Sequence, residues 1–165
     1  MTLTRWNPLL VALHWLVAVL VILGLVFGLA VLEALPNDDA KLNPLRIHVI
    51  AGLTIGVLMV LRILVRLFTR RPPKPDSGSR LLNGLRATVH FLLYVVVLSM
   101  VSTGVGIALM SGLFDILFGA GGALPESFDA FEPKQGHEFF AGVLLVLVLI
   151  HFVAALYHQY VLKDG

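Results

Sequence analysis

Apolar residues in this chain are gathered into four long blocks separated by short polar segments. The blocks cover about residues 8–32, 44–68, 85–110 and 137–162. Each reaches or exceeds the ~20 residues that an α-helix needs to cross the hydrocarbon core of a bilayer. A fifth apolar stretch, at 113–123, is short and glycine-rich and contains Asp115. The pattern predicts four transmembrane helices and, at 113–123, an interfacial loop or a short helix.

Short connections between the blocks predict an up-down-up-down bundle of antiparallel helices. The charges indicate its orientation, because eight of the ten acidic residues fall on one side, where the only basic residues are Lys41, Arg46 and Lys134. By the positive-inside rule, both termini and the stiff loop at 70–75 face the cytoplasm, while loops 33–43 and 111–136 face the periplasm or exterior. The basic residues of the cytoplasmic side are Arg5, Arg62, Arg66, Arg70, Arg71, Lys74, Arg80, Arg86 and Lys163.

Composition agrees with a single membrane domain over residues 1–165 and removes several kinds of chemistry. Hydrophobic residues make up 58% of the chain and charged residues only 13%, against about 25% charged in a soluble domain. The absence of cysteine excludes disulfides, thiolate haem ligation, cysteine-ligated iron–sulfur clusters and covalent haem attachment. Nucleic-acid binding is not expected either, because the basic residues gather at the membrane edges.

Histidines are the candidate functional residues, since an ionisable side chain inside a membrane helix points to function by default. His137 and His151 are 14 residues apart in the fourth block. In an α-helix this spacing is a rise of ~21 Å and almost a whole number of turns. Both rings therefore look out of nearly the same face, one in each half of a ~30 Å hydrocarbon core. Two redox centres that pass electrons across a membrane would use such a pair.

Depth in the bilayer sorts the histidines into two sites. His48 lies one turn inside the outer end of the second block, and His137 begins the fourth block at the same end, so these two can meet. The inner half offers four candidates for two places, and a histidine that forms hydrogen bonds to a neighbouring helix is the simpler alternative for each. The four are His14, His90, His151 and His158.

Two arguments select His14 and His151 for the inner site. His158 lies 21 residues after His137, or ~31 Å along a helix, which places it at the cytoplasmic boundary. A flat cofactor against a helix also needs a small residue one turn from its ligand, because positions i and i+4 share a face. His14, His48, His137 and His151 are followed at i+4 by Ala18, Gly52, Ala141 and Ala155, whereas His90 and His158 are followed by Tyr94 and Leu162.

Two imidazoles on different helices suit haem better than zinc. Zinc sites usually have four close protein ligands, often including cysteine or carboxylate. Two histidines can instead hold a flat macrocycle from opposite faces, which gives a six-coordinate iron suited to electron transfer. We therefore expect two haem groups, one held by His48 and His137 and the other by His14 and His151.

The remaining polar residues have two interpretations each. His90 and His158 are either interfacial or helix–helix hydrogen-bonding groups, or they form a quinone pocket on the cytoplasmic side, since histidine offers both hydrogen bonds and protons near neutral pH. Arg46 and Lys134 precede His48 and His137 by two and three residues. They either bind haem propionates, or draw a small anion toward the haem edge, or serve only as topology charges.

With these residues laid out, the chain resembles the bacterial di-haem cytochrome b-561 family over nearly its whole length. The resemblance rests on a set of segments in order, each of which is weak alone. They are Leu13-His14-Trp15-Leu16, Arg46-Ile47-His48-Val49, Leu61-Arg62-Ile63-Leu64-Val65-Arg66-Leu67, Val89-His90-Phe91, Gly136-His137-Glu138 and His151-Phe152-Val153-Ala154-Ala155-Leu156-Tyr157-His158.

The resemblance implies a four-helix inner-membrane protein that holds two b haems by bis-histidine ligation and exchanges electrons with ubiquinone. It implies, more narrowly, a superoxide oxidase that needs no protein partner. Superoxide would then give its electron to the His48/His137 haem near Arg46 and Lys134, and the electron would pass through the His14/His151 haem to ubiquinone near His90 and His158. The same family contains cytochrome b subunits of hydrogenases and formate dehydrogenases, so an electron-transfer subunit is the alternative. A non-redox membrane protein is the third.

Overall fold

The computed structural model of the chain describes residues 6–70, 79–119 and 121–163. These residues form an all-α protein with four helices long and apolar enough to cross a membrane, at Pro8–Leu32, Asp39–Phe68, Arg80–Met110 and Glu132–Leu162. The predicted fold class and the predicted number of spans are confirmed. Arg5, Arg71 and Lys74, together with most of the predicted basic loop, lie outside the described residues.

The first and last spans each end in a short π-helical segment. Helix α1 (Pro8–Phe27) continues as η1 (Gly28–Leu32), and α5 (Glu132–Tyr157) continues as η3 (His158–Leu162). Between them lie α2 (Asp39–Phe68) and α3 (Arg80–Met110). The stretch expected to be an interfacial loop or short helix contains the six-residue helix α4 (Leu113–Phe118), and a 3-10 turn, η2 (Phe128–Ala130), precedes α5.

Three of the four long helices begin five residues earlier than their apolar blocks. Helices α2, α3 and α5 start at Asp39, Arg80 and Glu132. The polar residues ahead of each block supply what a helix start needs: the side chain of Asp38 accepts from the backbone N–H of Ala40, and a proline occupies the first turn of α5. The start of a helix is therefore fixed by its cap and not by the edge of its hydrophobic block.

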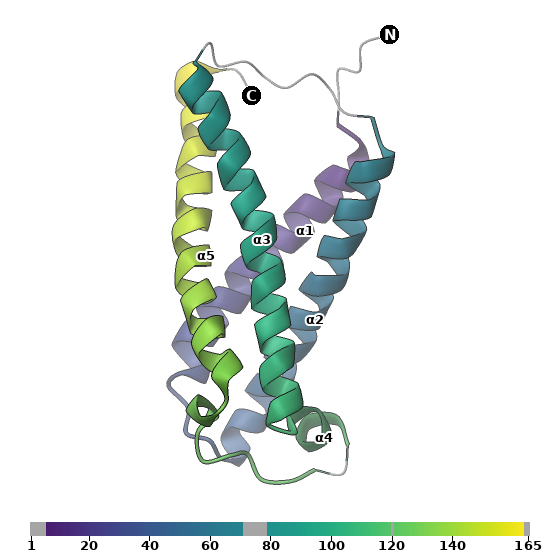
Figure 1. Cartoon of the computed structure of the whole chain (residues 1–165), viewed down its shortest axis with the longest axis vertical. Helices are drawn as coiled ribbons and strands as arrows, with labels where there is room; N and C mark the ends of the chain where they lie inside the picture. Colours follow the sequence, from purple (N-terminus) through teal and green to yellow (C-terminus); the bar gives the residue numbers. More distant parts are fainter. Residues whose placement is uncertain (1–5, 71–78, 120, 164–165) are drawn as a thin grey trace.

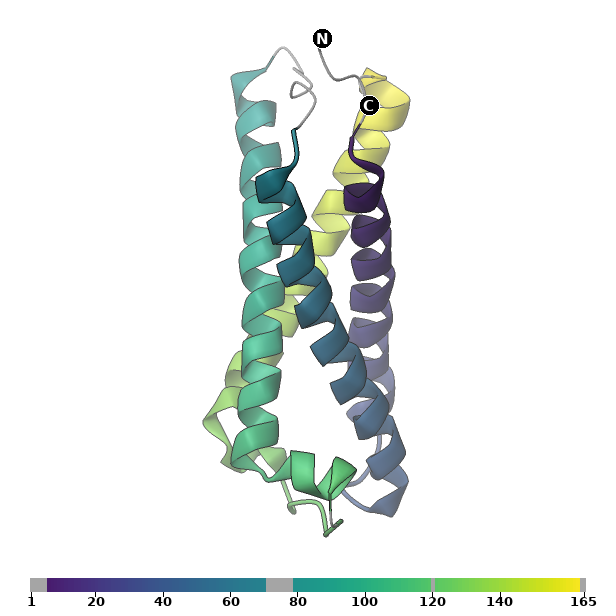
Figure 2. The same cartoon turned by 90° about the vertical axis from the view of Figure 1, so that its right-hand side faces the viewer.

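The long helices form an up-and-down bundle in which α1 packs on α2, α2 on α3, and α3 on α5 (Figures 1 and 2). Helix α1 begins and α5 ends at the same end, and α4 lies across the opposite end (Figure 1). The α4 end, which the charge pattern predicts to face the exterior, is here named the outer end, and the opposite end the inner end.

Buried side chains recur along α1 at intervals of three or four residues from Leu10 to Leu25, as expected for a helix that packs against a core. The central cluster takes residues from all four long helices, including Val17, Met59, Val96 and Leu144. A second cluster lies beneath α4. Outward faces are apolar as well, with Trp15 65% and Phe68 85% exposed. Such faces are what a helix presents to lipid.

Candidate functional site

At the outer end the bundle brings together two of the predicted histidines, His48 from α2 and His137 from α5. Their ring centroids are 6.2 Å apart and their planes are inclined at 77°. Each ring lies on the face of its helix that carries core residues, because His48 and His137 each precede a buried residue, Ile55 or Leu144, by seven positions. The structure therefore places His48 and His137 side by side, as the sequence predicts.

The two outer histidines differ in their hydrogen bonds. His137 Nδ1 lies 3.1 Å from the carbonyl oxygen of Met100 and 3.1 Å from Thr103 Oγ1. A carbonyl can only accept, so this contact places the proton of His137 on Nδ1 and leaves the lone pair on Nε2. His48 Nδ1 is buried and has no hydrogen-bond partner among the described residues. A polar atom buried in this way calls for an explanation, such as a bound group.

Both outer rings line a cavity of about 500 Å³ enclosed by the long helices and the outer loops. This volume is within the ~300–1,000 Å³ of cofactor and ligand sites. Glycines keep space open beside the rings: a Cβ added at Gly28 would lie 3.6 Å from His48 Cε1, and one at Gly104 would lie 3.3 Å from His137 Cε1. The cavity wall is otherwise mainly apolar and becomes polar toward the outer loops.

At the inner end three histidines from three helices form a cluster. The centroids of His14 and His151 are 6.2 Å apart, with planes inclined at 86°, and those of His90 and His151 are 5.0 Å apart. His90 Nδ1 lies 2.7 Å from the carbonyl oxygen of Arg86, one turn earlier in α3. His158 lies two turns beyond His151 at the start of η3, with its ring centroid 6.2 Å from that of Tyr157.

The two outer cations selected from the sequence are both engaged with protein acceptors. Lys134 Nζ forms an ion pair with Glu138 and lies 3.5 Å from Glu33 and 3.9 Å from Asp129. The Arg46 guanidinium donates to the carbonyl oxygen of Leu117 and to Asn43 Oδ1. Lys134 is among the residues that line the cavity, whereas Arg46 is not.

Lys41 lines the cavity in the position expected of Arg46. Its Nζ donates to Asn37 Oδ1 and to the carbonyl oxygen of Leu35, both neutral acceptors. Helical rotation explains the difference, because each residue turns the chain by about 100°. Arg46 is two residues from His48 and points elsewhere, while Lys41 is seven residues away and shares its face. The seven-residue spacing between Lys41 and His48 could have identified Lys41 from the sequence. The sequence argument favours Arg46 instead because Arg46 is nearer to His48 along the chain.

The inner end also holds two cations inside the bundle that the sequence had suggested only as topology charges. Arg62 and Arg66 of α2 lie over the ring of Tyr94 of α3, with guanidinium carbons 5.3 and 5.7 Å from the ring centroid. Tyr94, the bulky residue one turn after His90, is thus packed against both arginines. Its hydroxyl is buried and has no hydrogen-bond partner among the described residues.

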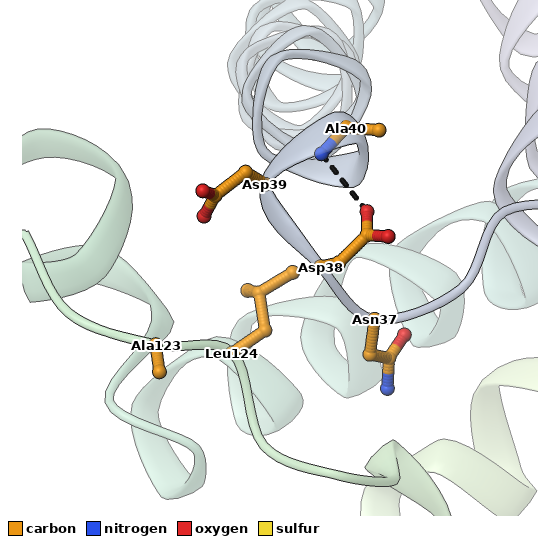
Figure 3. A pocket seen from close by; sticks show the side chains of 6 residues that line it. All are labelled: Asn37, Asp38, Asp39, Ala40, Ala123 and Leu124. Atoms are coloured by element: carbon orange, nitrogen blue, oxygen red, sulfur yellow. Dashed lines mark hydrogen bonds between the residues drawn. The ribbon is translucent and has the colours of Figure 1, made fainter.

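A second hollow, of about 390 Å³, lies beside the start of α2 (Figure 3). It is lined by Asn37, Asp38, Asp39, Ala40, Ala123 and Leu124. The Asp38 carboxylate that Figure 3 shows there accepts the backbone N–H of Ala40 at 2.9 Å. The polar character of this hollow comes from the residues that begin and cap α2, and no histidine lines it.

Comparison with known proteins gives the family. The family model described as prokaryotic cytochrome b561 matches residues 5–164. The chain belongs to this family. It is 30% identical over 166 residues to the probable superoxide oxidase CybB of Yersinia pestis, an alignment that covers 98% of this chain and 92% of that protein. It is also 30% identical over 165 residues to cytochrome b562 of Cereibacter sphaeroides, with 96% and 90% covered.

Membership in this family makes the chain a prokaryotic multi-pass membrane protein that binds haem b and takes part in electron transfer. The described residues fit a haem better than a metal ion held by protein alone. Within 6–70, 79–119 and 121–163, no three histidine or acidic side chains converge as a metal site. What the structure offers instead is imidazole rings paired from different helices, an orphaned buried nitrogen on His48, and a cavity kept open by glycines.

Proposed function

We propose that this cytochrome b561 is a superoxide oxidase of the bacterial inner membrane, which oxidises periplasmic superoxide and reduces ubiquinone. In this proposal His48 and His137 hold one haem b near the outer end, and His14 and His151 hold a second near the inner end. Haem b, when bound, supplies one-electron transfer. The observation that carries the proposal is the pair of matched imidazole separations, one at each end of the bundle.

The separation of the rings supports these pairs. A histidine nitrogen binds a transition metal at about 2.0–2.1 Å, as in zinc sites, and the centre of the ring lies roughly 1 Å behind the nitrogen, so two imidazoles on opposite sides of one ion have centroids about 6 Å apart. His48 and His137 are 6.2 Å apart, as are His14 and His151. His90 and His151, at 5.0 Å, are too close to leave room for an ion between them.

The residues around the outer pair orient the His137 ring for binding a haem iron. Its Nδ1–H is oriented by the Met100 carbonyl and by Thr103, so the ring presents Nε2. Hydrogen bonds of this kind to the second ring nitrogen are a regular feature of metal-bound histidines, since they fix the tautomer and the ring orientation. At the inner end, the corresponding bond from Nδ1 to a backbone carbonyl belongs to His90.

The overall reaction balances without an additional reactant. Two superoxide anions lose one electron each and leave as dioxygen, while ubiquinone takes up two electrons and two protons to give ubiquinol. We place the quinone near His90 and His158 at the inner end, where histidine can donate hydrogen bonds and relay protons. His90 has its Nδ1 on the Arg86 carbonyl, so its Nε2 remains for this purpose. The orientation, with both termini cytoplasmic, follows from the distribution of Lys and Arg.

A purified single chain tests the proposal. Superoxide is added in a stopped-flow spectrometer, with and without a ubiquinone analogue. We expect rapid reduction of the b-type spectrum by superoxide and reoxidation that depends on the quinone. A spectrum that stays oxidised with superoxide, but is reduced when a partner dehydrogenase or hydrogenase is supplied, would reject the superoxide oxidase.

That second result would support the other candidate, a cytochrome b subunit that carries electrons between a partner protein and quinone. One observation favours it. All carboxylates in the described ranges belong to the outer end, and three of them surround Lys134. An acidic surface repels superoxide, which slows its approach, whereas it would attract a basic partner protein.

A further inference from the structure

Two half-buried glycines in the outer half of the bundle face space that the described part of the chain does not fill. Gly24 of α1 and Gly52 of α2 both line the outer cavity. A Cβ added at either of them would have no atom of a neighbouring segment within 4 Å among the described residues. Protein interiors are otherwise packed as densely as organic crystals. Two adjacent helices that both leave such a position open toward one cavity therefore point to an occupant.

Both glycines lie about one helical turn inward of the outer histidine rings. Gly52 is four residues after His48 in α2, which runs from the outer end to the inner end (Figure 1). Helix α1 runs the other way, and Gly24 lies four residues before Gly28, whose added Cβ would be 3.6 Å from His48 Cε1. Four residues are a rise of about 6 Å. On α5 the corresponding position, four residues after the other outer histidine, is the small residue Ala141, which also lines the cavity.

Gly56, one turn further along α2, shows that open space is not common to all the glycines of these helices. Gly52 and Gly56 have the G-x-x-x-G spacing that is frequent where membrane helices pack. A Cβ added at Gly56 would lie 2.9 Å from Val101 Cγ1, and Gly56 is not among the residues that line the cavity. Gly56 therefore serves the contact between α2 and α3, whereas Gly52 leaves room for a bound group.

The lining of this space suits the apolar edge of a flat macrocycle. Toward the inner end the cavity is lined by buried apolar side chains, those of Val21, Ile55, Val97 and Leu144. Toward the outer end lie the two imidazole rings with centroids 6.2 Å apart, one of which, His48, has a buried nitrogen without a partner among the described residues. A haem held between these rings extends beyond its two axial ligands. Its edge therefore needs an open position one turn from a ligand, because positions i and i+4 share a face.

We propose that Gly24 and Gly52 provide the clearance for the apolar edge of the haem held by His48 and His137. This inference rests on the proposed function, because it requires a haem at the outer pair. It assigns a role to two residues that neither bind the iron nor carry a functional group. The absence of a side chain at these two positions determines whether a macrocycle fits between the two rings.

The test fills the space and measures haem per chain by pyridine haemochrome on purified protein. Gly24→Leu and Gly52→Leu place a side chain where the chain itself offers no obstacle, so both variants should fold with wild-type helical content. Each should lose the outer haem, so that two haems per chain become one, and the midpoint potential of the remaining inner haem should not change. Thermal unfolding should match that of His48→Ala, which we expect to lack the same haem.

Gly84→Leu is the matched control, because Gly84 of α3 is equally open but is not among the residues that line the cavity. This variant should keep both haems. Gly56→Leu gives a second contrast: its side chain would meet Val101, so we expect a lower unfolding temperature than for Gly52→Leu. If a leucine variant does not fold, the series Gly52→Ala and Gly52→Val decides, because transfer of the outer haem to an apoprotein acceptor should become faster as the side chain grows.

Two haems per chain in both Gly24→Leu and Gly52→Leu, or equal transfer rates for the wild type, Gly52→Ala and Gly52→Val, would overturn the inference while the proposed function stands. A change of oligomeric state in these variants with both haems retained would assign the glycines to helix association and overturn it as well. Unchanged haem content in both His48→Ala and His137→Ala would show that no haem lies at the outer pair, and both proposals would then be wrong.

Discussion

The outer and inner histidine sites differ in the charges around them. At the outer end, Lys134 is surrounded by Glu33, Asp129 and Glu138. At the inner end, Arg62 and Arg66 lie over Tyr94, and the described residues there include no carboxylate. Reduction adds a negative charge, so cations favour the reduced form of a nearby redox group and carboxylates oppose it. This difference supports the proposed direction of electron transfer, from the outer end to the inner end.

The largest effect is expected from substitutions that test whether the outer histidines hold a haem. We expect His48→Ala or His137→Ala to remove one of two haems, because loss of either imidazole leaves the iron with a single protein ligand. The inner spectrum should persist. Haem per chain, measured on purified protein by pyridine haemochrome, gives the answer. Two haems per chain in both variants would show that the outer assignment is wrong.

A second set of substitutions tests which two of the three inner histidines hold the haem. His14→Ala and His151→Ala should each remove the inner haem and spare the outer one. His90→Ala is the matched control: its ring is 5.0 Å from that of His151, too close for the two to hold one iron, so both haems should remain. Loss of the inner haem in His90→Ala, with retention in His14→Ala, would replace His14 by His90 as the partner of His151.

The charge difference itself predicts the order of the two midpoint potentials, with the inner haem higher than the outer. A unit charge about 10 Å away contributes roughly 1–2 kcal/mol at an effective dielectric constant of about 20. Since 1.4 kcal/mol is about 59 mV for one electron, a separation of several tens of millivolts is expected. Potentiometric titration of the wild type, with His48→Ala and His14→Ala to assign the two components, measures it. An outer haem with the higher potential would contradict the proposed direction.

A smaller effect is expected at the hydrogen bond that orients His137. Thr103→Val removes the hydroxyl 3.1 Å from Nδ1 but leaves the Met100 carbonyl in place. Loss of a hydrogen bond to a metal-bound histidine typically costs 10–100-fold in metal affinity, so we expect about 10-fold for the outer haem. Haem transfer to an apoprotein acceptor reports this affinity. Ser102→Ala, on the exposed side of α3 with its hydroxyl on Leu98, is the control and should change nothing.

Much of this arrangement could be predicted because it depends on local and periodic features. Hydrophobic blocks of sufficient length predicted the four spans, and the 14-residue interval between His137 and His151 placed two rings on one face of one helix. The distance of each histidine from the end of its apolar block then predicted that His48 lies beside His137, as it does in the structure. The apolar blocks predict the starts of α2 and α5 five residues too late, because Asp38 and Pro133, which begin these helices, lie in polar sequence outside the blocks.

What the sequence did not reveal depends on rotation and on contacts between distant loops. Arg62 and Arg66 were interpreted as topology charges, although their spacing from His48 puts them on its face. Of the three carboxylates around Lys134, Glu138 is only one helical turn away, but Glu33 and Asp129 come from other segments that only the folded outer end brings to it. The contact of Asn37 with the Pro125 carbonyl, 88 residues away, has no local signal at all.

The smallest expected effect concerns how an anion reaches the outer site. Lys41 lines the cavity and its ammonium donates hydrogen bonds to two neutral oxygens, whereas Arg46 does not line it. Lys41→Gln should therefore slow reduction by superoxide several-fold at low ionic strength, and Arg46→Gln, its matched control, should slow it less. Steering by a surface charge weakens with added salt, since the Debye length falls from about 30 Å at 0.01 M to about 10 Å at 0.1 M. Stopped-flow rates at these two salt concentrations make the measurement. Equal, salt-independent rates in the two variants would show that Lys41 does not guide the anion, and the acidic outer surface would then be better suited to a protein donor than to superoxide.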